Sequence, residues 1–182
     1  METFRRKIVG VVGSSAQSIP RGDEVLAYRL GAWIARSQHH LLTGGGPGVM
    51  AAASQGFCSV SSRQGLSIGV IPEGKLPGFY PNLWVELPIY THLRGENPIA
   101  KDSRNHINIR TCHALVALPG GSGTQAEIEL AIAREVRYGI VACLRENDKI
   151  GNLTATTIGN LGVVVAQDYD NVIRVLAPFL LC

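Results

Sequence analysis

Residues 119–127 read Pro-Gly-Gly-Ser-Gly-Thr-Gln-Ala-Glu, and their neighbours make them the most informative part of the chain. The apolar run 114–118 before them is typical of a buried strand, and residues 128–134 after them are helix-like. The first N–H groups of a helix lack backbone partners and carry the positive end of the helix dipole, so they attract anions. Because glycine has no Cβ, a phosphate can approach its backbone closely. The stretch therefore predicts a strand, an anion-binding turn and a helix in direct succession.

A second glycine turn has the same organisation. Residues 44–48 read Gly-Gly-Gly-Pro-Gly, follow the strand-like run 41–43 and precede the helix-like run 49–53. Pro47 lies near the first helical turn, where the missing N–H of proline costs least. Neither turn continues into the Gly-Lys-Ser/Thr of a P-loop, and neither matches the dinucleotide fingerprint in full. Two such turns in one short chain predict a phosphate-holding cleft, provided that the sheet brings them together.

Strand-like and helix-like segments alternate along the whole sequence, and several strands are apolar on both faces. This pattern predicts an α/β fold, a Rossmann-like parallel sheet of about seven strands with helices on both faces, in a single domain over residues 1–182. Ligands of such sheets bind beyond the carboxyl ends of the strands. The expected strands are 7–13, 39–43, 66–72, 83–90, 112–118, 139–144 and 163–166. The expected helices are 20–37, 48–62, 99–111, one from 124 and 169–181, and residues 152–162 are expected to be a connection.

Composition excludes several classes of protein. Of the 182 residues, 46% are apolar and 17% charged, which is typical of a globular chain rather than a disordered one. The net charge of +3 is small and the basic residues are scattered, so nucleic acid is not an expected partner. The N-terminus lacks a signal-peptide core and no apolar run reaches membrane-spanning length, so a cytoplasmic protein is expected. The cysteines show no metal-type spacing, so reduced thiols and no metal site are predicted: Cys58, Cys112, Cys143 and Cys182.

The predicted ligand is a phosphate-bearing small molecule. Its candidate contacts are the glycines and hydroxyl residues at the carboxyl ends of three predicted strands: Gly13, Ser14, Ser15, Gly45, Gly46, Gly48, Gly120, Gly121, Ser122, Gly123 and Thr124. Each has an alternative structural explanation. The glycines could serve tight turns that need positive φ, and Ser14 and Ser15 could cap the first helix.

Three motifs resemble one known family. Residues 44–50, 69–72 and the Pro-Gly-Gly-x-Gly-Thr-x-x-Glu of 119–127 are similar to the lysine decarboxylase-like Rossmann superfamily. This superfamily includes the LONELY GUY cytokinin-activating phosphoribohydrolases and the molybdenum cofactor carriers. The resemblance covers about residues 8–165, and its last motif is specific for the group but not for one activity. Residues 90–103 and the alanine-rich helix after residue 127 are more similar to the carrier branch.

The resemblance implies a function and a set of residues. A carrier holds the pterin-based molybdenum cofactor as cargo, protects it from oxidation and delivers it to molybdoenzymes or cofactor-synthesis proteins, and such proteins form homodimers or homotetramers. The alternatives are a nucleoside 5′-monophosphate phosphoribohydrolase, with Arg104 and Glu127 as catalytic residues, and a non-catalytic nucleotide sensor. Asn105 stands where the hydrolase pattern has lysine, and the methionine before its arginine is missing.

Arg104 and Glu127 have structural explanations as well. Thr124 and Glu127 have the spacing of a capping box, in which each side chain binds the backbone N–H of the other residue. Arg104 could be a solvated helix residue, which is the usual place of an arginine. The resemblance instead implies that Arg104 contacts a phosphate or ribose and that Glu127 accepts ligand N–H groups.

Overall fold

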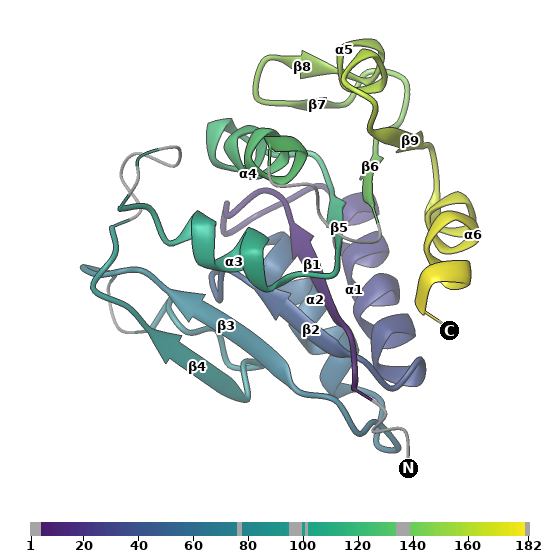
Figure 1. The fold of residues 1–182 in the computed structure, drawn as a ribbon. Coiled ribbons are helices and arrows are strands. Elements are labelled where there is room, and N and C mark those ends of the chain that lie inside the picture. The colour runs from purple at the N-terminus through teal and green to yellow at the C-terminus, as the bar shows by residue number, and fades with distance from the viewer. Residues whose placement is uncertain (1–4, 76–77, 95–99, 101, 134–138, 181–182) are drawn as a thin grey trace.

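Seven parallel strands form one sheet in the computed structural model, which describes residues 5–75, 78–94, 100, 102–133 and 139–180. Their order across the sheet is β4-β3-β2-β1-β5-β6-β9, so the predicted Rossmann-like fold is confirmed (Figure 1). The central strands are apolar on both faces because helices cover both sides. The strands are β1 (Ile8–Val12), β2 (His40–Thr43), β3 (Ser67–Ile71), β4 (Leu87–Tyr90), β5 (Ala114–Ala117), β6 (Ile140–Cys143) and β9 (Val164–Ala166).

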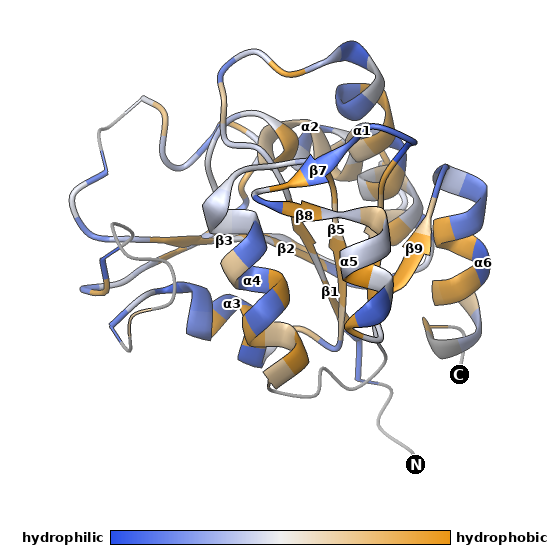
Figure 2. Cartoon of the chain, turned by 90° about the horizontal axis from the view of Figure 1, so that it is seen from above, coloured by the Kyte–Doolittle hydropathy of each residue, from blue (hydrophilic) through white to orange (hydrophobic). Residues whose placement is uncertain are grey.

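Helices cover the sheet in two layers, which Figure 2 shows with the sheet edge-on between them. One layer contains α1 (Arg21–Arg36), α2 (Val49–Cys58) and α6 (Tyr169–Leu180). The other contains α3 (Asn105–Thr111), α4 (Ser122–Ala133) and α5 (Ala155–Asn160). Fully buried side chains fill each interface, including Leu30, Phe57 and Leu176 in the first layer and Ile128 and Ile158 in the second. Burial of these apolar side chains holds the carboxyl ends of the strands in place.

Helices α1 and α2 touch through two glycines. A Cβ on Gly31 would overlap the carbonyl oxygen of Ala53, and a Cβ on Gly56 would overlap that of Tyr28. The two backbones therefore pack directly against each other, which leaves no room for a side chain at either position. The start of α2 lies beside the turn that follows β1, where the Val49 amide donates to the Ser14 carbonyl at 3.0 Å.

The prediction for residues 152–162 was wrong. Strands β7 (Lys149–Ile150) and β8 (Leu153–Thr154) form a hairpin, and α5 follows it. Residues 152–162 therefore contain β8 and α5. Thr154 caps α5 by accepting a hydrogen bond from the Thr157 amide at 3.2 Å. The strands of two residues and the helix of six are too short for a periodic pattern. They are stabilised by tertiary packing, because Ile150 and Ile158 are fully buried in the α4 layer.

Two helices also end or begin at residues other than those predicted. Helix α2 ends at Cys58 rather than near residue 62, and α3 begins at Asn105 rather than 99. Residues 99, 101 and 181 of the predicted helices lie outside the described residues. Within the described part of the chain, the structure contains no helix with the length and apolar character needed to cross a membrane.

Candidate functional site

The strand order reverses next to β1. From β1 the chain proceeds through β2 and β3 to β4 at one edge, and it then returns to β5 on the other side of β1. Strands β2 and β5 are therefore not neighbours, and the turn after β1 lies between the two glycine turns. Ser14 joins all three segments, because its amide donates to the Pro119 carbonyl and its carbonyl accepts from the Val49 amide, both at 3.0 Å. The glycine turns thus meet at a topological switch point, where ligands of α/β sheets bind.

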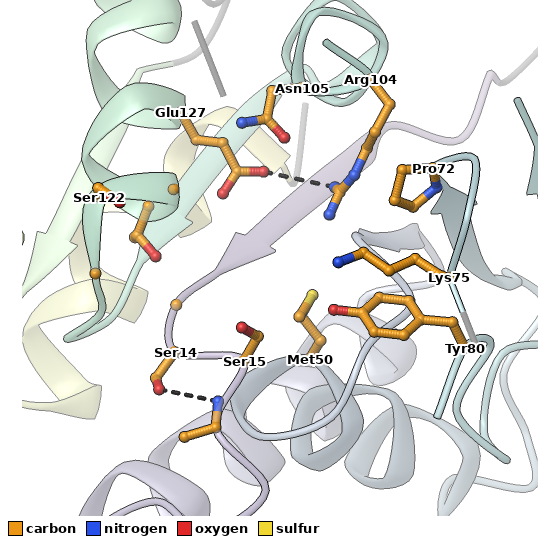
Figure 3. Close-up of a pocket in the computed structure, with 15 residues that line it drawn as sticks. Ser14, Ser15, Met50, Pro72, Lys75, Tyr80, Arg104, Asn105, Ser122 and Glu127 are labelled. Carbon is orange, nitrogen blue, oxygen red and sulfur yellow. Dashed lines mark hydrogen bonds and ion pairs between the residues drawn. The ribbon is translucent and has the colours of Figure 1, made fainter. Parts of the chain in front are cut away.

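A cavity of about 550 Å³ opens at this point, within the usual size range of ligand sites (Figure 3). Its walls come from the turn after β1, the start of α2, the loop after β3, the start of α3 and the start of α4. The lining residues are Gly13, Ser14, Ser15, Ala16, Met50, Pro72, Lys75, Tyr80, Arg104, Asn105, Gly121, Ser122, Gly123, Thr124 and Glu127.

Gly121 and Gly123 face open space. A Cβ built on either would meet no atom within 4 Å, and neither has positive φ. A tight turn therefore does not explain them, whereas a close approach by a ligand to the start of α4 does. Gly120 differs, because its Cβ would lie 3.0 Å from the Ser14 amide nitrogen and it does not line the cavity. Gly120 lets two turns pack together, and Gly121 and Gly123 leave the first amides of α4 accessible.

The second glycine turn lies behind the cavity wall. Gly45 and Gly48 have positive φ, +71° and +69°, so tight-turn geometry explains both of them. Gly46 is backed by the ring of Tyr80. None of these three glycines, which were predicted as ligand contacts, is among the residues that line the cavity.

Arg104 and Glu127 meet inside the cavity, as the dashed line in Figure 3 shows. Arg104 is the N-terminal flanking residue of α3, and its Nη1 lies 3.8 Å from Glu127 Oε1. Both side chains are nearly buried, with 12% and 10% exposed. Arg104 Nη1 is buried without a hydrogen-bond partner among the described residues. A buried guanidinium N–H without an acceptor costs free energy, so this N–H is available to donate to a ligand oxygen.

Burial raises the pKa of Glu127, and the Arg104 charge and a hydrogen bond from Asn108 oppose this shift without cancelling it. The Asn108 side-chain N–H₂ group donates to Glu127 Oε1 at 3.2 Å. The carboxyl group therefore takes up a proton more easily than an exposed glutamate does. It can accept a hydrogen bond when ionised and donate one when protonated.

The two helix-capping explanations, for Thr124 with Glu127 and for Ser14, are wrong. Helix α4 begins at Ser122, three residues before the position that the capping box requires, and the Glu127 carboxylate contacts Arg104 and Asn108. Ser14 does not cap α1, because α1 follows Pro20 and the Ser14 hydroxyl accepts from the Ala16 amide at 3.2 Å.

The sequence reasoning missed the wall formed by the loop after β3. Lys75 and Tyr80 both extend into the cavity from this loop, and the Lys75 ammonium lies 5.3 Å from the centre of the Tyr80 ring. The cavity is therefore lined by two cationic side chains, Arg104 and Lys75, and one carboxylate, Glu127, so positive charge predominates. A lysine in a glycine-rich loop beyond the carboxyl end of a strand was the available signal. Among the described residues, no group of three or more His, Cys, Asp and Glu side chains is arranged to hold a metal ion.

The raised pKa of Glu127 predicts a pH dependence of stability. Because the folded-state pKa exceeds the unfolded value of 4.5, the folded protein binds the extra proton between these two values. The free energy of unfolding therefore falls as pH rises through this window and stays lower above it. Glu127→Gln removes this loss, and we expect it to be more stable than the wild type at pH 7.5. Urea unfolding at pH 4 and pH 7.5 measures the difference; equal pH slopes for both proteins would contradict it.

Comparison with known proteins gives one family and several similar structures. A model of the SLOG cluster4 family matches residues 6–172. An uncharacterised protein of Archaeoglobus fulgidus is 32% identical over 124 residues, covering 68% of this chain and 72% of its own length.

Two solved structures of proteins with a stated ligand are also similar to this chain. The molybdenum cofactor binding protein of Rippkaea orientalis has a TM-score of 0.76 at 28% identity, and the molybdenum cofactor carrier protein of Chlamydomonas reinhardtii has 0.77 at 29%. Each comparison covers 97% of this chain and 99% of the other.

Proposed function

This chain belongs to the SLOG cluster4 family, and from that premise we propose that its cavity binds the molybdenum cofactor, which the protein carries, protects and delivers. The observation that carries the proposal is the pairing of an open helix start at Gly121–Gly123 with a buried arginine whose Nη1 lacks a hydrogen-bond partner. The similarity to structures of a molybdenum cofactor binding protein and a carrier protein supports the same cargo.

The residues of the cavity fit the chemical groups of this cargo. The first amides of α4, with the Ser14 and Ser15 turn beside them, suit a terminal phosphate. The Glu127 carboxylate suits pterin N–H groups, and Arg104 suits ligand oxygens. When bound, the cargo brings the molybdenum and its redox chemistry, while the protein contributes binding, orientation and a partly enclosed space.

Binding is tested with cofactor released anaerobically from a purified molybdoenzyme. We expect saturable binding of one cofactor per chain with micromolar or tighter affinity, measured by ultrafiltration followed by oxidised-pterin fluorescence and molybdenum analysis. An unrelated protein of similar charge is the control. Retention no greater than that of the control would refute the carrier proposal. Activation of a cofactor-free molybdoenzyme by the loaded protein tests delivery and identifies a partner.

The same preparation separates the alternatives. Release of free adenine and ribose 5-phosphate from AMP, lost in Glu127→Ala, would favour the phosphoribohydrolase. Intact nucleoside monophosphates would reject it. Nucleotide binding that changes the oligomeric state without cleavage would favour a sensor. The homodimer or homotetramer expected from the resemblance stays a prediction, which the molar mass in solution tests.

A further inference from the structure

The second glycine turn contains two kinds of glycine. Gly45 and Gly48 have positive φ, which explains them by backbone conformation alone. Gly44 and Gly46 have no positive φ, so their backbone conformation does not itself demand glycine. A different reason must account for them.

That reason is the same at both positions. A Cβ on Gly44 would lie 2.5 Å from Nη1 and 2.8 Å from Cζ of Arg104, and its three nearest atoms all belong to the Arg104 guanidinium. A Cβ on Gly46 would lie 2.5 Å from Cζ and 2.6 Å from Cε1 of Tyr80, and its three nearest atoms all belong to the Tyr80 side chain. Each planar group therefore occupies the space that a side chain on the turn would fill.

Arg104 and Tyr80 both line the cavity, and they come from segments far from the turn in the sequence (Figure 3). Asn82 fastens the Tyr80 loop to the turn, because its amide donates to the Gly45 carbonyl at 2.8 Å and its side-chain N–H₂ group donates to the Gly46 carbonyl at 2.9 Å. On the opposite side, Arg104 is drawn toward Glu127 by their charges. Arg104 and Tyr80 thus both pack against the second glycine turn, at Gly44 and Gly46.

We infer that Gly44 and Gly46 are positioning residues, which act on the ligand through Arg104 and Tyr80 and do not touch it themselves. The second turn thereby takes part in ligand binding. The effects on ligand affinity expected below rest on the proposed function. Its physical basis, the contact between each glycine and one side chain, is independent of the identity of the cargo.

Gly44→Ala separates this role from a purely structural one. The added methyl group meets the far end of a flexible side chain, so the guanidinium can move while the fold is kept. If the clash with Arg104 is the only fault, Arg104→Ala removes it. Gly44→Ala should therefore have no effect in a protein that already lacks the arginine. A double-mutant cycle tests this, because it compares the effect of Gly44→Ala with and without Arg104.

The experiment uses inorganic pyrophosphate as the anion probe, with calorimetric titration and thermal unfolding of the four members of the cycle. We expect Gly44→Ala to weaken binding about 10-fold and to lower Tm by a few degrees. In the Arg104→Ala background, we expect it to change affinity by less than about 2-fold and Tm by less than about 1 °C. Gly159→Ala is the control, because its Cβ, unlike that of Gly44, meets no atom within 4 Å and it lies away from the cavity. The pair Gly46→Ala and Tyr80→Ala forms a second cycle.

The outcomes are distinguishable. Wild-type affinity and Tm for Gly44→Ala, or losses that add to those of Arg104→Ala, would overturn the positioning role. An insoluble Gly44→Ala whose double variant with Arg104→Ala folds would support it. If the wild type binds neither pyrophosphate nor the molybdenum cofactor, the proposed function fails, while the Tm cycle still decides whether Gly44 makes space for Arg104.

Discussion

Arg104→Ala is expected to weaken binding of the molybdenum cofactor by about 100-fold and to leave the protein folded. Hydrogen bonds to charged groups contribute roughly 1.5–3 kcal/mol each, and each 1.4 kcal/mol corresponds to a factor of ten in affinity. Arg104 has a buried N–H without a hydrogen-bond partner in the described protein and lies at the cavity wall, so its loss removes both charge and donor. We expect the fold to be kept because the substitution leaves the apolar clusters between the sheet and its helices unchanged.

Arg110→Ala is the matched control for this prediction. It removes the same kind of side chain from α3, the helix that Arg104 precedes, but at an exposed position outside the cavity. Ultrafiltration with the cofactor measures both variants, and circular dichroism checks their folding. Equal affinities for the two variants would show that positive charge in general, rather than the placed guanidinium, attracts the ligand.

Gly121→Val is expected to reduce cofactor affinity by about 100-fold or more while Tm falls only slightly. The Cβ of the new side chain enters open space, with no protein atom within 4 Å, and the side chain occupies the approach to the first amides of α4. A phosphate kept away from these amides loses several hydrogen bonds together with the favourable end of the helix dipole. Replacing glycine by valine at this helix start costs about 1 kcal/mol of stability, because valine is a poor N-terminal cap.

Gly159→Val provides the comparison, since its Cβ likewise enters open space but at α5, away from the cavity. Titration with pyrophosphate and with the cofactor should show a loss for Gly121→Val and none for Gly159→Val. Unfolding of Gly121→Val would assign the glycine to stability, and unchanged affinity would remove the anion site from the start of α4.

The local elements of this fold were predictable because their signals lie in neighbouring residues. The run before Pro119 is apolar on both faces, and the glycines after it lead directly into a helix, so strand, turn and helix follow from short-range chemistry. The hairpin and α5 were missed because their stability comes from burying Ile150 and Ile158 against distant elements. Propensity alone is weak evidence over segments of this length.

The candidate site shows the same division. Residues at the carboxyl ends of parallel strands were expected to gather, and Ser14, Ser122 and Glu127 do line one cavity. Lys75 and Tyr80 were missed because the loop that carries them has no periodic pattern, and its course over the cavity depends on contacts such as those of Asn82.

By itself, the sequence determined a parallel α/β sheet, the two glycine turns and the positive helix start at the end of β5. Only the tertiary structure decided that β1 lies between those turns, that Gly121 and Gly123 face the cavity, and that Gly44 and Gly46 lie behind Arg104 and Tyr80. The physical reason is the range of the interactions. Backbone conformation and periodic burial depend on residues adjacent in the chain, whereas the space beside a glycine is filled by whichever distant side chain the packing brings there.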